Sequence, residues 1–123
     1  MKNSILPNNL KKGDKISLIS TARKIDVEKL AHAKEVFNNW GLKVVEGKNL
    51  RAESNQFCGT DMQRASDLQD AVNDNSIKAI ICFRGGYGTV RILDSVDFSS
   101  LIKNPKWICG YSDVTALHNY LNS

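Results

Sequence analysis

Residues 77–83 read Ile77-Lys78-Ala79-Ile80-Ile81-Cys82-Phe83, an almost continuous apolar run. A run of this length and composition is typical of a strand that is buried on both faces, as the strands of parallel sheets are. Shorter apolar runs lie on both sides of it along the chain, and amphipathic segments separate them. This alternation predicts a parallel sheet that is covered by helices on both faces.

Three further strands are predicted from apolar runs at residues 15–20, 42–46 and 106–110. With the strand at 77–83, they predict a flavodoxin-like α/β domain of three layers, whose mostly parallel sheet has about four strands. The sequence of 123 residues contains no internal repeat or low-complexity segment. One domain over residues 1–123 is therefore expected.

The first helix is predicted after the first strand. Asp26 is suited to cap its beginning, and Gly41 is suited to end it. The residues with helical spacing that predict its buried stripe are Val27, Leu30, Ala33, Phe37 and Trp40.

The second helix is predicted from a capping box, in which the Thr60 hydroxyl and the Gln63 amide satisfy two free backbone N–H groups. Its buried face is predicted at Ala65, Leu68 and Val72. Short helices are expected at 89–93 and 98–102, and a last helix at 114–121.

Composition excludes several classes of function. The 17 basic and 13 acidic residues are mixed along the chain and leave a net charge of +4, so no basic stripe predicts nucleic acid binding. No apolar run approaches the ~20 residues that cross a membrane. Residues 1–7 have no apolar core of secretory length, so a cytoplasmic protein is expected.

Three cysteines, an odd number, argue against a disulfide framework. Cys82 and Cys109 stand in apolar runs and are interpreted as small buried hydrophobic residues. Cys58 stands in a polar stretch, where a reactive thiol is conceivable, but no histidine or acidic neighbour supports that role. The two histidines and the cysteine spacing predict no metal site, and no cofactor is expected.

Three loops are expected at the carboxyl ends of the strands, where open parallel sheets bind ligands. They comprise residues 20–23, 84–88 and 110–113. In the last of them, Ser112 stands between a strand and a predicted helix, which is how some folds present a nucleophile. A serine there is also a favoured helix cap, and Val114 replaces the second glycine of the usual hydrolase turn.

The side chain of Asp113 would stabilise the beginning of the last helix through the helix dipole, and its backbone N–H follows the candidate nucleophile. The glycine-rich loop Arg84-Gly85-Gly86-Tyr87-Gly88 has three interpretations: a turn, a phosphate cradle, or a source of an oxyanion donor. Six helical residues separate His118 from Ser112, about 9 Å and 240°, so His118 is not expected to act as its base. His32 is expected on the surface of the first helix.

Three ordered motifs together resemble the N-terminal domain of the LD-carboxypeptidase family of serine peptidases (peptidase family S66), which includes the microcin-immunity peptidases. They are Gly59-Thr60-Asp61 with Arg64 and residues 67–69, then residues 80–88, then residues 110–118. Residues 10–16 fit the same pattern. The similarity extends over nearly the whole sequence.

The resemblance implies a metal-independent hydrolysis of the peptide bond between an L-residue and a D-residue, which releases D-alanine from cytoplasmic murein tetrapeptides during peptidoglycan recycling. It implies Ser112 as nucleophile and the N–H groups of Gly86 and Asp113 as oxyanion donors. Arg84, Gly85 and Tyr87, in the same loop as Gly86, are expected to bind substrate.

The triad glutamate and histidine of that family come from a C-terminal domain, which is not found in these 123 residues. Residues 1–123 are therefore expected to be inactive alone, because the nucleophile lacks its general base. The expected partners are the murein peptide, that C-terminal domain and a second copy in a homodimer. Three alternatives stay open: a peptidase acting on a peptide-nucleotide, a non-catalytic module that binds nucleotide or phosphate, and a purely structural fragment.

Overall fold

The computed structural model describes residues 9–83 and 87–110, and the structural statements below concern those residues. Their four strands form one sheet in the order β2-β1-β3-β4. The strands are β1 (Lys15–Ile19), β2 (Lys43–Glu46), β3 (Ile77–Cys82) and β4 (Trp107–Cys109). All neighbouring strands are parallel, as predicted.

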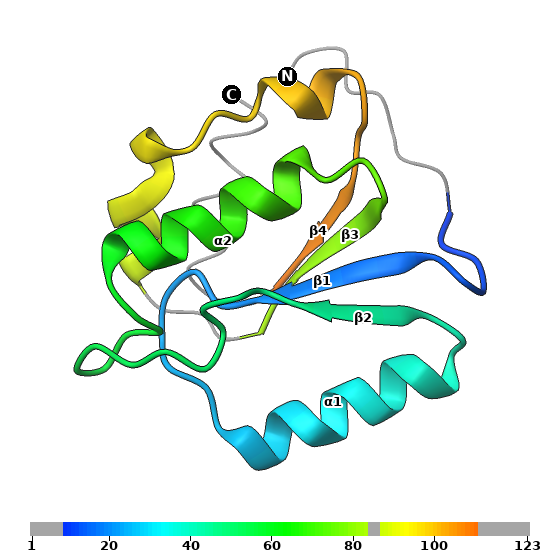
Figure 1. Cartoon of the computed structure of the whole chain (residues 1–123), viewed down its shortest axis with the longest axis horizontal. Coiled ribbons are helices and arrows are strands. Elements are labelled where there is room, and N and C mark those ends of the chain that lie inside the picture. Colours follow the sequence, from blue (N-terminus) through cyan, green and yellow to red (C-terminus); the bar gives the residue numbers. More distant parts are fainter. Residues whose placement is uncertain (1–8, 84–86, 111–123) are drawn as a thin grey trace.

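The sheet lies between two helical layers (Figure 1). Helix α1 (Val27–Asn39) covers one face, and α2 (Asp61–Asn73) covers the other. Two short 3-10 segments, η1 (Tyr87–Ser95) and η2 (Ser99–Ile102), join β3 to β4 and pack beside α2. The three-layer, flavodoxin-like α/β fold predicted from the sequence is confirmed.

Local signals in the sequence determine where both helices begin. The Asp26 carboxylate accepts the N–H of Glu28 at 2.9 Å, which caps α1. The capping box of α2 is complete: Gln63 N–H donates to the Thr60 hydroxyl at 3.2 Å, and Thr60 N–H donates to the Gln63 side chain at 2.9 Å. Gly41 follows α1 with φ of +83°, a left-handed conformation that ends the helix without strain.

The two faces of the sheet carry separate parts of the core. Leu68 and Val72 of α2 pack against Ile19 and Ile80, as their spacing predicts. On the opposite face, Leu30 of α1 packs with two other buried residues, Leu18 and Leu50.

The predicted stripe of α1 is only partly correct, because Leu30 alone is fully buried in that helix. Val27 is 57% exposed and Trp40 is 62% exposed. Val27 is the first residue of α1, and Trp40 is the residue after the last helical one. The side chain of Trp40 packs edge-on against Phe37, with ring centroids 5.7 Å apart.

The remaining helix predictions have different outcomes. The two short helices exist as 3-10 segments, and the first is longer than predicted because it begins at Tyr87 and ends at Ser95. The helix predicted at 114–121 lies outside the described residues. None of the helices in the described ranges has the length and apolar character that a bilayer crossing requires.

Candidate active site at the carboxyl edge of the sheet

The residues predicted to carry the chemistry fall mainly outside the described part of the chain. Ser112, Asp113 and the loop residues Arg84, Gly85 and Gly86 belong to this group, as does His118. The backbone of Tyr87 is described as the first residue of η1. Their roles remain predictions. The structure shows the strands that precede these loops and the start of η1, which follows the glycine-rich loop.

Strands β3 and β4 bring two of the predicted loops to neighbouring positions. Ile81 of β3 is paired with Cys109 of β4, so the two strands end side by side. The glycine-rich loop follows Phe83, and the segment with Ser112 follows Gly110. The chain therefore enters both loops at the same edge of the sheet, as the sequence predicts.

The loop after β1 is held against the segment that leaves the glycine-rich loop. The hydroxyl groups of Thr21 and Thr89 share a hydrogen bond of 2.7 Å, and both side chains are completely buried. Gly88 lies so close that a Cβ atom there would stand 3.2 Å from Ala22 Cα. Two of the three predicted loops thus contact each other directly.

The polar connection before α2 contributes an aromatic ring to this edge. Its backbone runs beside the loop after β1, where Cys58 N–H donates to the Ala22 carbonyl at 2.8 Å and Lys24 N–H to the Gln56 carbonyl at 3.0 Å. This pairing places Phe57 next to η1. A Cβ atom at Gly88 would stand 3.0 Å from the Phe57 ring, so only glycine fits without a shift.

A buried arginine joins these segments. The Arg64 side chain, on α2, is 1% exposed. Its Nε donates to the Thr21 carbonyl at 3.1 Å and its Nη1 to the Gly59 carbonyl at 2.7 Å, while Nη2 pairs with the Asp61 carboxylate. The guanidinium lies 4.7 Å from the centre of the Phe57 ring.

Interpretation of the motifs in the sequence did not assign a role to Arg64. A signal was present, because Arg64 lies four residues before the buried Leu68 and so faces the core on the same side of α2. A charged residue at a core-facing position is almost never fully buried unless it is paired. The helical spacing of position 64 could therefore have pointed to a buried polar network.

The thiols do not form a nucleophilic site. Cys58 is buried, its Sγ donates to the Leu50 carbonyl at 3.1 Å, and burial followed by the Asp67 carboxylate raises its pKa to about 11. The reactive-thiol interpretation is not supported, because the thiolate is scarce near neutral pH. Burial likewise raises the pKa of Cys82 to about 12.

Cys109 differs from its prediction as a buried residue, because the structure leaves it exposed. It lies on β4, the edge strand, where β3 is the only neighbouring strand among the described residues.

His32 is exposed on α1, as predicted. Across residues 9–83 and 87–110, no group of three histidine, cysteine or acidic side chains is arranged to hold a metal ion.

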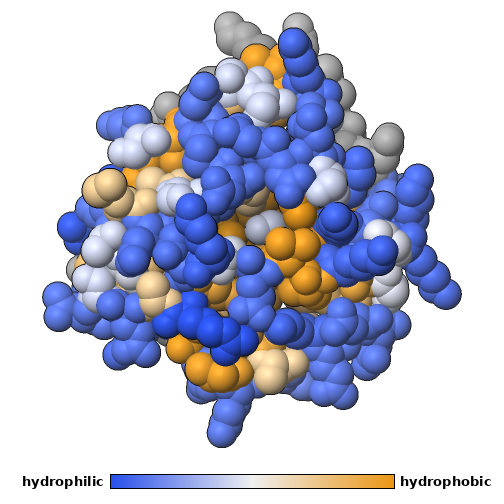
Figure 2. Space-filling view, in the orientation of Figure 1, coloured by the Kyte–Doolittle hydropathy of each residue, from blue (hydrophilic) through white to orange (hydrophobic). Residues whose placement is uncertain are grey.

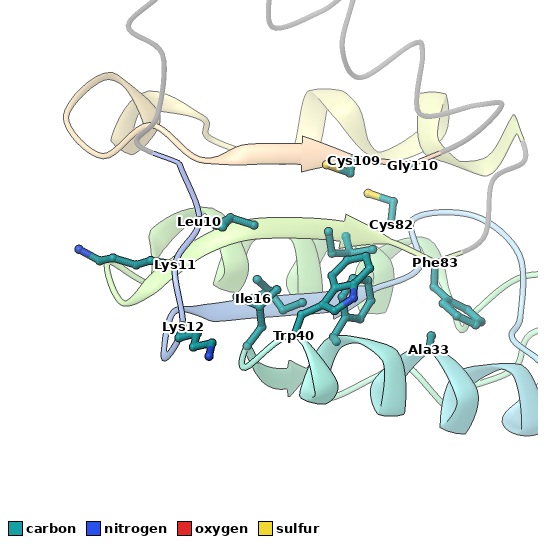
Figure 3. Close-up of a pocket in the computed structure, with 13 residues that line it drawn as sticks. Leu10, Lys11, Lys12, Ile16, Ala33, Trp40, Cys82, Phe83, Cys109 and Gly110 are labelled. Carbon is teal, nitrogen blue, oxygen red and sulfur yellow. The ribbon is translucent and has the colours of Figure 1, made fainter.

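A cavity of about 770 Å³ opens on the α1 side of the sheet, between that helix and the ends of β3 and β4 (Figure 3). Ile16, Trp40 and Phe83 line it with apolar surface, and Gly110 borders it at the edge where the loops meet. Elsewhere, hydrophilic side chains cover most of the face seen in Figure 2, with hydrophobic patches between them. An apolar lining suits packing better than proton transfer.

Comparison with known families agrees with the fold. The family model described as the LD-carboxypeptidase N-terminal domain, of peptidase family S66, matches residues 16–123. The chain belongs to the LD-carboxypeptidase family. The resemblance noted from the motifs is thereby confirmed.

Individual relatives of this LD-carboxypeptidase domain support the assignment. A probable murein peptide carboxypeptidase of Bacillus subtilis (strain 168) is 39% identical over 116 residues, which cover 94% of this chain and 36% of that protein. The solved structure of the microcin C7 self-immunity protein MccF, in complex with aspartyl sulfamoyl adenosine, is 31% identical with a TM-score of 0.86. It is matched over 93% of this chain and 35% of its own.

A muramoyltetrapeptide carboxypeptidase from Oxalobacter formigenes is also similar in structure, at 30% identity and a TM-score of 0.73. The match covers 84% of this chain and 34% of that one. The chain thus spans about a third of the length of the relatives that it matches.

Proposed function

We propose that the protein containing these residues is a serine-type LD-carboxypeptidase, a hydrolase that cleaves the L,D-peptide bond of murein tetrapeptides and releases the terminal D-alanine. The observation that carries the proposal is the side-by-side ending of β3 and β4, which lead into the glycine-rich loop and the serine segment. Family membership supports a peptidase at this edge, and relatives named as murein peptide carboxypeptidases support the substrate.

The proposed mechanism uses an acyl-enzyme. Ser112 Oγ attacks the carbonyl carbon of the L-residue, and a general base from the C-terminal domain accepts the hydroxyl proton. The N–H groups of Gly86 and Asp113 stabilise the negative oxygen of the tetrahedral intermediate. The C–N bond then breaks, the amine of D-alanine takes the proton, and water hydrolyses the ester to restore Ser112.

We assign residues 1–123 as the nucleophile-bearing domain and Arg84, Gly85 and Tyr87 to substrate binding, since they flank the proposed donor Gly86. The general base is assigned to a glutamate and a histidine of a C-terminal domain. That second domain is the proposed intramolecular partner, and a homodimer is the proposed assembly.

We further propose a cytoplasmic role in peptidoglycan recycling. All three cysteines are free thiols, and two of them are buried, which suits a reducing compartment. Free murein tetrapeptides produced by cell wall turnover would be the substrate pool there.

A second candidate substrate is a peptide-nucleotide, as expected for a microcin-immunity peptidase. The specific observation in its favour is the similarity to MccF, whose structure was solved with aspartyl sulfamoyl adenosine. The attack by Ser112 would be the same, and the acyl group carried by the acyl-enzyme would differ.

The test measures D-alanine release from murein tetrapeptide by the natural chain that contains these residues. We expect Ser112→Ala to lower the rate by about 10⁴-fold or more, because the residual rate comes only from binding and oxyanion stabilisation. Ser95→Ala, an exposed serine at the end of η1, is the matched control and should keep the wild-type rate. D-alanine release that persists in Ser112→Ala would contradict the mechanism.

The same assay separates the alternatives. Hydrolysis of an aminoacyl sulfamoyl adenosine without hydrolysis of the tetrapeptide would favour the immunity-type substrate. Nucleotide binding that survives Ser112→Ala, with neither substrate hydrolysed, would instead identify a binding module.

A further inference from the structure

We propose that Arg64 is a positioning residue for the hydrolysis: it fixes the start of η1, where the chain leaves the glycine-rich loop, and so orients the oxyanion donor of that loop. This inference rests on the proposed function. It concerns a side chain that does not touch the substrate and acts through the backbone that it holds.

The first step is that Arg64 joins the loop after β1 to the start of α2. Its donors reach the Thr21 carbonyl after β1, at 3.1 Å, and the Gly59 carbonyl before α2, at 2.7 Å. The third partner is the Asp61 carboxylate on the first turn of α2. Planar guanidinium donors point in fixed directions, so a single arginine satisfies all three acceptors at once.

The second step is that the partners held by Arg64 are those that contact the start of η1. Thr21 shares its hydroxyl hydrogen bond with Thr89 at 2.7 Å. The ring of Phe57, on which the Arg64 guanidinium lies, contacts the position of Gly88.

A further contact extends this set along η1. The second carboxylate oxygen of Asp61 pairs with Arg91 Nη2 at 3.2 Å. The Arg91 guanidinium also lies 5.1 Å from the centre of the Phe57 ring. Residues 88, 89 and 91 of η1 are therefore all fixed by groups that Arg64 orders.

The third step concerns burial. Arg64 is 1% exposed, so its removal takes away the donor to two buried carbonyl groups and one of the two guanidinium groups that lie on the Phe57 ring. Lysine carries the same charge but cannot supply three donors in the directions that these acceptors require. Arg64→Lys should therefore loosen the start of η1 while the rest of α2 keeps its packing.

The opposite end of η1 offers a matched control. Gln69, also on α2, donates to the Asp97 carbonyl at 2.9 Å and accepts the Asp97 N–H at 2.7 Å. Gln69→Ala breaks this pair of exposed hydrogen bonds between α2 and the β3–β4 connection without reaching the loop edge. If general loosening of the packing on α2 lowers the turnover number, Arg64→Lys and Gln69→Ala should both show that loss.

The experiment uses the natural chain that contains these residues and combines hydrogen exchange with kinetics on murein tetrapeptide. For Arg64→Lys we expect amide exchange over residues 88–91 to rise about 10-fold. The turnover number should fall about 10²-fold with KM within about threefold, because a displaced oxyanion donor affects the transition state more than the ground state. Gln69→Ala should raise exchange near residue 97 and leave the turnover number within about twofold.

The outcomes are distinguishable. A folded Arg64→Lys variant with wild-type exchange over residues 88–91, or with a wild-type turnover number, would overturn the positioning role. A wild-type chain without carboxypeptidase activity would overturn the proposed function, and the exchange measurement would still decide whether Arg64 fixes η1. If Arg64→Lys does not fold, Thr89→Val removes only the hydroxyl link, and it should show the same two changes at smaller size; wild-type values in that variant would overturn the inference.

Discussion

At the scale of single residues, the thiols show how strongly the surroundings control reactivity. Cys58 and Cys82 are buried, with pKa values raised to about 11 and about 12. Cys109 is exposed on the edge strand, and partial burial raises its pKa as well. The pKa of each thiol is raised, and Cys109 differs from the other two in being exposed.

We predict that a thiol reagent at pH 8 modifies Cys109 first. Cys58 would have a thiolate fraction of about 10⁻³ at that pH and no open path to the reagent, so it should react only when the fold opens. Mass spectrometry after timed labelling measures the order, and labelling in denaturant provides the control in which all three react. Modification of Cys58 as fast as Cys109 in the native chain would contradict this account.

Position 64 is the other residue whose role depends on its surroundings. A buried guanidinium costs a large desolvation free energy unless its donors are satisfied. In this fold, two backbone carbonyls and one carboxylate satisfy them. The cost of burying Arg64 is thus offset by contacts at the edge where we propose the chemistry.

At the scale of elements, an ion pair connects α1 to the sheet. The Lys34 ammonium of α1 lies 2.6 Å from the Glu46 carboxylate of β2. Its hydrogen bond, with a further one from Arg51, holds the pKa of Glu46 below its ordinary value of 4.5, although burial acts in the opposite direction. The pair helps to hold α1 over the β1–β2 half of the sheet.

We predict that Glu46→Gln lowers the free energy of unfolding at pH 7 by about 0.5–1 kcal/mol. Because the pKa of Glu46 is lower in the folded state, its stabilising effect is complete above the ordinary value of 4.5 and is lost as the pH falls through the folded-state pKa. Urea unfolding from pH 7 to pH 3 measures this, and the difference in unfolding free energy between the variant and the wild type should shrink toward the acidic end.

Glu53→Gln is the matched control for that measurement. Glu53 pairs with Lys24 at 3.8 Å, and both side chains are more than half exposed. Its removal should change the free energy of unfolding very little at any of these pH values. A pH-independent loss in Glu46→Gln would mean that the amide packs badly and that the charge is not the cause.

At the scale of the whole molecule, the described domain forms an edge where loops from three strands are expected to meet, and it spans about a third of the length of its relatives. Such a domain is proposed to supply the nucleophile and the oxyanion donors, with the general base on another domain. A serine hydroxyl without a base is a weak nucleophile.

We predict that residues 1–123 alone do not release D-alanine from murein tetrapeptide, whereas a chain in which a C-terminal domain with the triad glutamate and histidine follows them does. The rate should differ by about 10⁴-fold or more, as it does when triad members are removed. Circular dichroism of the 123-residue chain is the control for folding. Comparable turnover by the folded short chain would contradict the assignment of the base to a second domain.

The sequence by itself determined the features that depend on neighbours along the chain. The Thr60–Gln63 capping box, the Asp26 cap and the buried face at Leu68 and Val72 follow from local hydrogen bonds and helical periodicity, and all were predicted. The nearly continuous apolar run of β3 likewise predicted a buried strand of a parallel sheet, and β3 lies between β1 and β4.

Tertiary structure decided which of the predicted apolar residues are covered and which polar residues are buried together. Trp40 and Cys109 belong to apolar patterns but are exposed. Trp40 follows the last residue of α1, and Cys109 lies on β4, which is an edge strand. Arg64 reaches Thr21, 43 residues earlier in the chain, and no local spacing specifies that contact. Burial is a property of the space around a side chain, and distant segments fill that space only when the sheet has formed.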